Sequence, residues 1–340
     1  MNISDFQYPL PPELIAQEPA RPRDSSRLLV LHRDTEEITH RTFRDFPEYL
    51  RPDDVVVFND TQVIKARLHG LRAGGGKAEV LLLEEREAGV WEALASPGRR
   101  LPPGREIVFP ELGLRAEILS RTASGGRIIR FHGPAEAVAS LADLGEMPLP
   151  PYITRPLESE SDYQTVYARL PGSSAAPTAG LHFTPEMLEA VRGRVHAIAY
   201  LALHIGLATF RPVHAERVED HDMHTEKYVI PEPTAEVVTQ AVAEGRRVVA
   251  IGTTTVRALE SAADEDGRVQ PGPGETGLFI RPGYRFRVVG GLLTNFHLPR
   301  ATLLILVSAF AGRESILRAY AEAVEQSYRF LSFGDAMFIA

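Results

Sequence analysis

Residues Arg247–Glu260 read RVVAIGTTTVRALE and place a strand, a tight turn and a helix in immediate succession. The apolar, β-branched run Arg247–Ile251 is typical of a buried strand, and a helix over Thr255–Ala263 follows it directly. A buried strand that leads straight into a helix indicates an α/β layer with a largely parallel sheet.

Predicted strands and helices alternate on both sides of this segment. Arg27–His32 and Glu37–Phe43 read as two paired strands, Val55–Phe58 reads as a buried strand, and Val195–Ile205 is a further β-branched, apolar run. The other helix candidates are Phe46–Leu50, Glu186–Arg192, Thr234–Glu244, Ala301–Ala311 and Glu314–Gln326.

The middle of the chain changes to short β-rich runs separated by glycine and proline. The six runs are Ala66–Leu71, Lys77–Leu83, Val90–Ala95, Glu106–Phe109, Leu114–Ser120 and Arg127–Phe131. Six short strands at this spacing predict a small antiparallel barrel, which a helix at Pro134–Leu144 would close. We therefore predict an α/β domain made of residues 1–65 and 151–340, with an inserted β-barrel at 66–150.

Composition narrows the possible functions. The 340 residues include no cysteine, which excludes disulfides, thiolate catalysis, iron–sulfur clusters and cysteine-ligated zinc. No signal peptide is visible, and the apolar stretch Ala301–Ala311 is far shorter than the ~20 residues of a membrane span, so we expect a cytoplasmic protein without membrane contact. The net charge of −8 argues against an extensive RNA-coating surface but permits a local basic patch.

Two polar segments precede or begin predicted helices. Ser173–Thr184 reads SSAAPTAGLHFT, where small residues permit close approach of a ligand and where Thr178 and His182 could supply a hydroxyl and a base. A structural loop with a helix cap explains that segment equally well. Thr253, Thr254, Thr255 and Arg257 follow the strand Arg247–Ile251, at the sheet edge where α/β proteins bind ligands. Hydroxyl N-caps are the alternative, but we favour a binding site for a carboxylate, a ribose or a phosphate.

Two further segments gather histidines with other polar groups. His221–Glu226 reads HDMHTE; it lacks the helical setting of a metal-binding HExxH motif, so acid–base or ribose-binding work by His224 and Glu226 is favoured over a metal site. A solvated loop remains the alternative there. Asn295 and His297 flank Phe296, a combination that suits an adenine edge and its stacking face, although a core phenylalanine beside a buried histidine has the same sequence.

Scattered basic residues are candidate phosphate contacts. Each is weak evidence alone, because most surface arginines are simply solvated. The candidates for RNA binding are Lys65, Arg67, Arg99, Arg100 and Arg300.

The chain resembles the S-adenosylmethionine:tRNA ribosyltransferase-isomerases of queuosine biosynthesis over nearly its whole length. The blocks that carry the resemblance include SDFQYPLPPELIAQEP, VVVFNDTQVIKARL, AAPTAGLHFT, HDMHTEKY, GTTTVRALES, GGLLTNFHLPRATLLILVSAFAG and YRFLSFGDAMFI. The resemblance implies an α/β domain with an inserted barrel. It also implies transfer and isomerisation of the ribosyl group of S-adenosylmethionine onto 7-aminomethyl-7-deazaguanine at the tRNA wobble position, which yields epoxyqueuosine-tRNA, adenine and methionine.

This chemistry suggests a task for each candidate. His182 or His224 would remove a proton from the 5′-carbon next to the sulfonium, with Glu226 as orienter or alternative base. Asn295 or His297 would donate to the leaving adenine. The other expected contacts are Thr253–Thr255 and Arg257 to the methionine carboxylate, and Asn59 and Asp60 to the acceptor base. S-adenosylmethionine is then a co-substrate, and we expect no metal, no other cofactor and a monomeric enzyme.

Two other functions compete with this hypothesis. A methyltransferase would place a glycine-rich loop after its first strand, but Arg33-Asp34-Thr35 stands there. A non-catalytic tRNA-binding adaptor would use the barrel and leave the polar loops of the α/β domain without a purpose.

Overall fold

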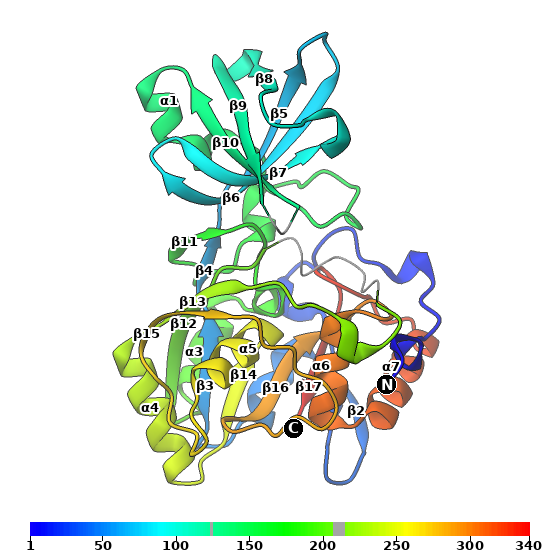
Figure 1. Ribbon diagram of the computed structural model, residues 1–340. Coiled ribbons are helices and arrows are strands. Elements are labelled where there is room, and N and C mark those ends of the chain that lie inside the picture. The colour runs from blue at the N-terminus through cyan, green and yellow to red at the C-terminus, as the bar shows by residue number, and fades with distance from the viewer. Residues whose placement is uncertain (123–124, 207–214) are drawn as a thin grey trace. The chain divides into compact units, whose positions relative to one another are not determined.

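The computed structural model describes residues 1–122, 125–206 and 215–340, and it divides into two compact units (Figure 1). The α/β unit comprises Met1–Thr61, Pro151–Leu170 and Ala176–Ala340, and the barrel unit comprises Gln62–Pro150 and Pro171–Ala175. Residues 62–65 and 171–175, which the sequence placed in the α/β domain, thus group with the barrel. Most of them belong to β4 (Thr61–Val63) and β11 (Leu170–Ser173), which pair in a separate two-stranded sheet.

The α/β unit is built on a nine-stranded sheet. Its strands, in spatial order, are β15 (Gly272–Thr276), β13 (Glu226–Ile230), β12 (Ala197–Leu203), β3 (Val55–Asn59), β14 (Val248–Ile251), β16 (Val289–Asn295), β17 (Ala336–Ile339), β1 (Arg27–Leu31) and β2 (Ile38–Thr42). The central strands β12, β3, β14 and β16 are parallel, as are β17 and β1. The other four pairings are antiparallel. The α/β class is confirmed, and the sheet is mixed, with its parallel strands concentrated at the centre.

Helices with apolar faces pack against this sheet. They are α3 (Pro185–Arg192), α4 (Glu232–Ala243), α5 (Thr253–Ala262), α6 (Thr302–Ala311) and α7 (Arg313–Glu325), and their ends lie within two residues of the predicted ones. The predicted helix Phe46–Leu50 is a 3-10 helix, η4 (Phe43–Tyr49). Phe183 packs edge-to-face on Phe43 and Phe46, with ring centroids 5.0 and 6.0 Å apart, so η4 and the segment just before α3 share one core.

The barrel unit contains the six predicted strands in a closed antiparallel barrel. The strands are β5 (Arg67–Arg72), β6 (Lys77–Glu87), β7 (Val90–Ser96), β8 (Glu106–Phe109), β9 (Leu114–Arg121) and β10 (Arg127–His132), in the order β10-β7-β6-β5-β8-β9. Closure brings β5 close to β8: a Cβ on Gly70 would lie 2.8 Å from Ile107. The predicted helix Pro134–Leu144 is two short helices, α1 (Ala135–Ala139) and α2 (Leu141–Leu144), because Ser140 leaves the helical conformation at φ −108°. Within the described ranges, no helix is long and apolar enough to cross a bilayer.

Candidate functional site

A pocket in the α/β unit lies at the carboxyl ends of three parallel strands. Ile205 follows β12, Gly252–Thr254 follow β14, and Thr294–Pro299 end β16. This is the sheet edge at which the sequence predicted ligand binding. Among the residues that the structure describes, the lining is Tyr152, Ala176, Pro177, Thr178, Ala179, Ile205, Gly252, Thr253, Thr254, Thr294, Asn295, Phe296, His297, Leu298, Pro299, Ala301, Leu303, Leu331 and Ser332.

Helix α5 begins at the pocket. Gly252 is its N-cap, with φ 91° and no side-chain cap, so the first N–H groups of the helix meet the lining at Thr253 and Thr254. Thr253, Thr254 and Thr178, which were predicted to bind substrate, all line the pocket. Thr255 does not: its hydroxyl donates to the Ile251 carbonyl at 2.7 Å and its side chain is fully buried inside the helix.

Asn295 supplies a hydrogen-bond acceptor to this region, not a donor. Its Nδ2 donates to the carbonyl oxygens of Leu331 at 2.9 Å and Ser332 at 3.5 Å. Because both neighbours can only accept, the amide orientation is fixed. Its Oδ1 is buried and has no partner among the described residues. The predicted donation from Asn295 to adenine is therefore corrected: the unsatisfied atom accepts.

His297 lines the pocket as a neutral ring. Burial lowers its pKa to about 3, and its Nε2 lies 2.9 Å from the Thr294 hydroxyl. The backbone of His297 is held as well, since its N–H donates to the Tyr320 hydroxyl at 3.1 Å and its carbonyl accepts from Tyr8. A protonated His297 would lack solvation here, which argues against its use as a cationic acid.

His182 lies outside the lining, on η8 (Thr178–His182), the same short 3-10 helix that brings Thr178 to the pocket. Its ring stacks on Phe43 with centroids 4.9 Å apart, and its Nδ1 lies 2.8 Å from the Ser26 hydroxyl. Burial, together with the charges of Arg329 and Arg23, lowers the pKa of His182 to about 3. These contacts make His182 part of the core and remove the support for its use as the base.

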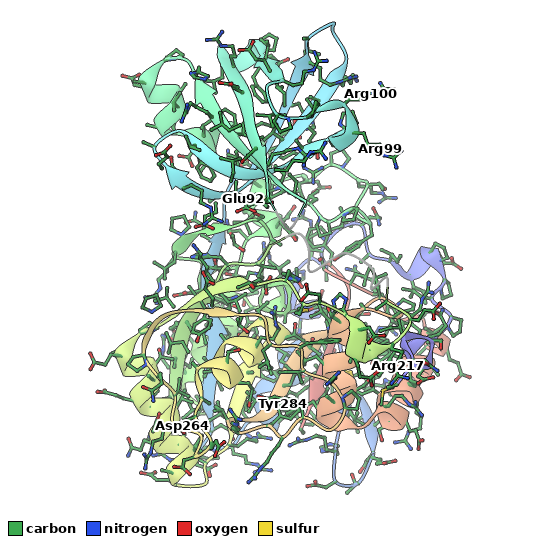
Figure 2. The ribbon with its side chains drawn as sticks, viewed as in Figure 1. Glu92, Arg99, Arg100, Arg217, Asp264 and Tyr284 are labelled. Carbon is green, nitrogen blue, oxygen red and sulfur yellow. The ribbon has the colours of Figure 1, made fainter. Side chains whose placement is uncertain are left out.

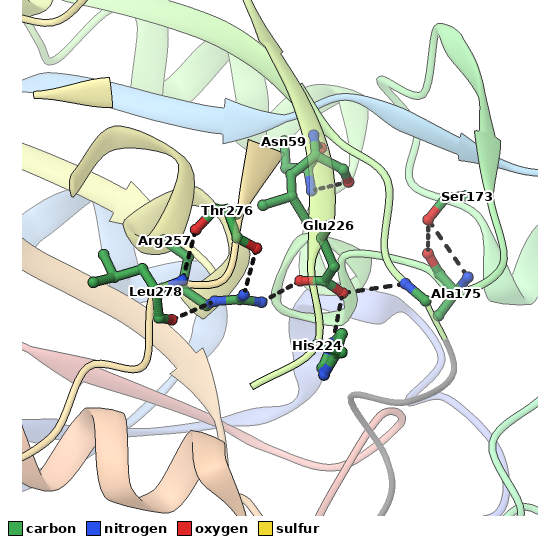
Figure 3. A network of polar contacts seen from close by, with 10 residues as sticks. Asn59, Ser173, Ala175, His224, Glu226, Arg257, Thr276 and Leu278 are labelled. Atoms are coloured by element: carbon green, nitrogen blue, oxygen red, sulfur yellow. Dashed lines mark hydrogen bonds and ion pairs between the residues drawn. The ribbon is translucent and has the colours of Figure 1, made fainter. Parts of the chain in front are cut away.

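Glu226 and Arg257 are buried and form a polar network with the half-buried His224 (Figure 3). Arg257 is 2% exposed and pairs through Nη1 with Glu226, while its Nε and Nη2 donate to the carbonyls of Leu278 at 3.2 Å and Thr276 at 3.3 Å. Glu226 also accepts from the Gly206 N–H at 3.1 Å and lies 3.3 Å from Nε2 of His224. Since Gly206 follows the lining residue Ile205, the network adjoins the pocket. The predicted binding of a methionine carboxylate by Arg257 loses support, because its guanidinium is committed to Glu226.

Asn59 and Asp60 stand at the end of β3. Asn59 is fully buried, donates to Leu203 and Thr254, and accepts from the N–H groups of Leu203 and Thr61. An amide with its donors and acceptor engaged in this way joins β3 to β12 and cannot also bind a base. Asp60 accepts two hydrogen bonds from Arg169 at one oxygen, while its other oxygen is buried without a described partner. Burial raises the pKa of Asp60, and the Arg169 charge opposes that rise.

The predicted RNA-binding residues differ in exposure. Arg99 and Arg100 are exposed on η5 (Gly98–Arg100) of the barrel unit, and Figure 2 shows their side chains projecting outward. Arg67 is partly committed, since it donates to the Leu149 carbonyl at 3.0 Å and lies 3.5 Å from Glu79. Lys65 is half-buried.

Arg300 is exposed in the α/β unit, with φ 57°, between the lining residues Pro299 and Ala301. Among the residues that the structure describes, no group of three or more histidine or carboxylate side chains could hold a metal ion.

Sequence reasoning missed several residues that shape the site. Tyr152 and Ser332 face each other across part of the lining, with their hydroxyls 2.8 Å apart. Both lie in segments without a recognisable chemical pattern, and only the block YRFLSFGDAMFI drew attention to Ser332.

The whole chain can be compared with known proteins. A family model described as "Queuosine biosynthesis protein" matches residues 3–339. The chain belongs to this family. It is 55% identical to the S-adenosylmethionine:tRNA ribosyltransferase-isomerase of Moorella thermoacetica, with all of both chains covered. It is 54% identical to the enzyme of the same name from Thermus thermophilus over 99% of each chain.

A solved structure agrees with this membership. The crystal structure of the S-adenosylmethionine tRNA ribosyltransferase from Thermotoga maritima matches with a TM-score of 0.56 and 40% identity. The match covers 99% of this chain and 100% of that one.

Proposed function

We propose that the chain transfers and isomerises the ribosyl group of S-adenosylmethionine onto 7-aminomethyl-7-deazaguanine at the wobble position of a tRNA. The observation that carries this proposal is identity of 54–55% over essentially full length to proteins named S-adenosylmethionine:tRNA ribosyltransferase-isomerase. The products are epoxyqueuosine-tRNA, adenine and methionine, and S-adenosylmethionine is the co-substrate without a further cofactor.

The pocket suits the nucleoside and amino acid portions of S-adenosylmethionine. Apolar lining residues such as Phe296 and Leu298 offer a surface for the adenine ring, and Asn295 offers an acceptor for its exocyclic amine. The N-terminus of α5 at Thr253 and Thr254 replaces Arg257 as the group that receives the methionine carboxylate, because N–H groups at a helix start favour anions.

Glu226, with His224 beside it, is the better candidate for the base. The base must take a proton from the 5′-carbon, whose acidity the sulfonium raises. The C5′ electron pair forms a C4′=C5′ double bond as the C4′–O4′ bond breaks, O4′ becomes a C1′ aldehyde, and adenine leaves with the electron pair of its C1′ bond and takes up a proton. The acceptor amine adds at C4′ and loses a proton, C5′ then bonds to C1′, and the resulting C1′ alkoxide displaces methionine from C5′ as a neutral thioether while the epoxide forms. Glu226 is tied to Gly206 at the edge of the lining, whereas His182 is packed on Phe43. Arg257 fixes the carboxylate of Glu226 in one orientation.

The tRNA is the second substrate, and exposed basic residues are its proposed phosphate contacts. Arg99, Arg100 and Arg300 are accessible for this purpose. Lys65 and Arg67 are further candidates that are less exposed. Such contacts release counterions, so tRNA affinity is expected to fall as the salt concentration rises.

The deciding experiment incubates the protein with S-adenosylmethionine and a tRNA that carries the deazaguanine precursor. Mass spectrometry should detect epoxyqueuosine in the tRNA together with free adenine. Release of S-adenosylhomocysteine would establish a methyltransferase instead. A failure to consume S-adenosylmethionine, with tRNA binding intact, would establish an adaptor.

A further inference from the structure

Arg127 is a buried arginine at an inward-facing position of the barrel. It begins β10, whose residues Arg127, Ile129 and Phe131 are buried while the alternate residues are not. Arg127 is only 6% exposed, and no carboxylate lies within ion-pair distance of it in the described part of the chain. A buried guanidinium without a carboxylate needs other acceptors for its five N–H donors.

Backbone carbonyls of two turns supply those acceptors. On one side, Nε donates to Leu101 at 3.0 Å and Nη2 donates to Gly98 at 2.9 Å. On the other side, Nη1 donates to Gly125 at 3.0 Å and Gly126 at 2.8 Å. One planar side chain therefore joins both ends of the 98–101 turn to the turn that precedes β10.

The 98–101 turn carries two exposed cations. Arg99 and Arg100 lie between the two carbonyls that Arg127 holds, and both are exposed. In the described residues neither forms an ion pair, whereas Arg115 and Arg130 on the barrel strands face Glu106 at 3.6 Å and Glu87 at 3.7 Å. Because Arg127 fixes the backbone on either side of them, these two adjacent exposed arginines form a pre-arranged pair of phosphate contacts.

We propose that Arg127 is a positioning residue for tRNA binding, which holds the 98–101 turn so that Arg99 and Arg100 meet neighbouring phosphates. The inference rests on the proposed function, because it takes the tRNA substrate as given. Arg127 itself does not touch the RNA. Lysine cannot replace it fully, since an ammonium offers three donors from one point and cannot reach both turns as the planar guanidinium does.

The test measures binding of a tRNA carrying the precursor base as a function of salt concentration. Arg99→Ala/Arg100→Ala should lower the slope of log K against log salt by roughly 1.4 for two single-strand phosphate contacts, equivalent to a roughly 25-fold loss of affinity at 0.1 M salt. Arg127→Met should lower the slope similarly. Combining all three changes should add little, because Arg127 acts through the other two. The matched control is Arg115→Ala/Arg130→Ala, which removes equal charge from the barrel wall and should leave the slope near wild type.

A purely structural Arg127 would give a different pattern. Arg127→Met would then lower the melting temperature while the folded protein kept the wild-type slope, and that result would overturn the proposal. If Arg127→Met does not fold, Arg127→Lys decides: an intermediate slope supports the proposal and a wild-type slope refutes it. A wild-type slope in Arg99→Ala/Arg100→Ala would refute it as well, and the wild-type protein would still form the modified nucleoside. Failure of the proposed function looks different, since the wild-type protein itself would form no modified nucleoside.

Discussion

At the scale of single residues, the unsatisfied Oδ1 of Asn295 leads to a prediction about adenine selectivity. Asn295→Leu should raise KM for S-adenosylmethionine roughly 3- to 10-fold, as expected for one lost hydrogen bond to a neutral donor. The sharper readout is an analogue with a dimethylated exocyclic amine, which cannot donate. The wild-type enzyme should discriminate against this analogue more strongly than Asn295→Leu does; equal discrimination by both would show that Oδ1 does not face the amine.

Two candidate bases can be separated by substitution. Glu226→Gln should lower kcat by about 10²–10⁴-fold, the usual contribution of a general base. His182→Gln should leave kcat within a few-fold of wild type at saturating substrates, because the ring is packed on Phe43 outside the pocket lining. Single-turnover release of adenine measures both variants. A large loss in His182→Gln with an unchanged melting temperature would return the catalytic assignment to His182.

His182 also makes the free energy of unfolding depend on pH in the acid range. Its pKa is about 3 in the folded protein, against about 6.5 when exposed, so the unfolded chain binds a proton between these values and the native protein does not. Stability that is present above about pH 6.5 is therefore lost as the pH falls toward 3, by about 1.4 kcal/mol per pH unit from this residue. Urea unfolding at pH 6 and pH 4.5 should show a smaller pH dependence for His182→Gln. An unchanged dependence would mean that the buried ring is protonated in the native state.

At the scale of elements, two helix starts offer a matched comparison. Gly252→Ala places a side chain on a residue at φ 91°, which should cost roughly 1–3 kcal/mol of stability. This backbone conformation also positions the first turn of α5 at the pocket. Thr184→Ala removes the hydroxyl that caps α3 through the Met187 N–H and costs about 1 kcal/mol. Both variants should melt at lower temperature, but only Gly252→Ala should raise KM for S-adenosylmethionine. If the two variants had equal KM values, the N-terminus of α5 would have no role in binding S-adenosylmethionine.

The elements also show what could be predicted from the sequence and what could not. Long periodic segments, such as α5 and the barrel strands, were predicted because their own apolar pattern specifies them. Strands such as β15, with the sequence GPGET, have no such pattern and exist because β13 offers a partner. At the site, the residues at strand ends were predicted, but the hydrogen bonds of their side chains were not. Nothing in the local sequence distinguishes Thr255, whose hydroxyl donates to the Ile251 carbonyl, from Thr253, which lines the pocket.

At the scale of the whole molecule, the two substrates should respond to salt independently. The described residues that line the pocket all belong to the α/β unit, whereas Arg99 and Arg100 belong to the barrel unit. Residues 62–150 hold 12 basic and 11 acidic side chains, so the remaining chain carries essentially all of the net charge of −8. Because the α/β unit is acidic, it does not attract a polyanion such as tRNA at long range. The affinity for tRNA must then depend on a few local contacts, which salt screens effectively.

Raising the salt concentration from 50 to 200 mM should therefore raise KM for tRNA steeply. The Kd for S-adenosylmethionine should change little, since contacts at the buried N-terminus of α5 are screened far less than those of exposed arginines. Calorimetry of S-adenosylmethionine binding without tRNA, set beside the kinetics, measures the two quantities separately. Arg99→Ala/Arg100→Ala is the internal control, because it should flatten the salt dependence for tRNA and leave S-adenosylmethionine binding unaltered. Parallel losses for both substrates would mean that salt weakens the pocket itself, and the independence of the two units in binding would have to be abandoned.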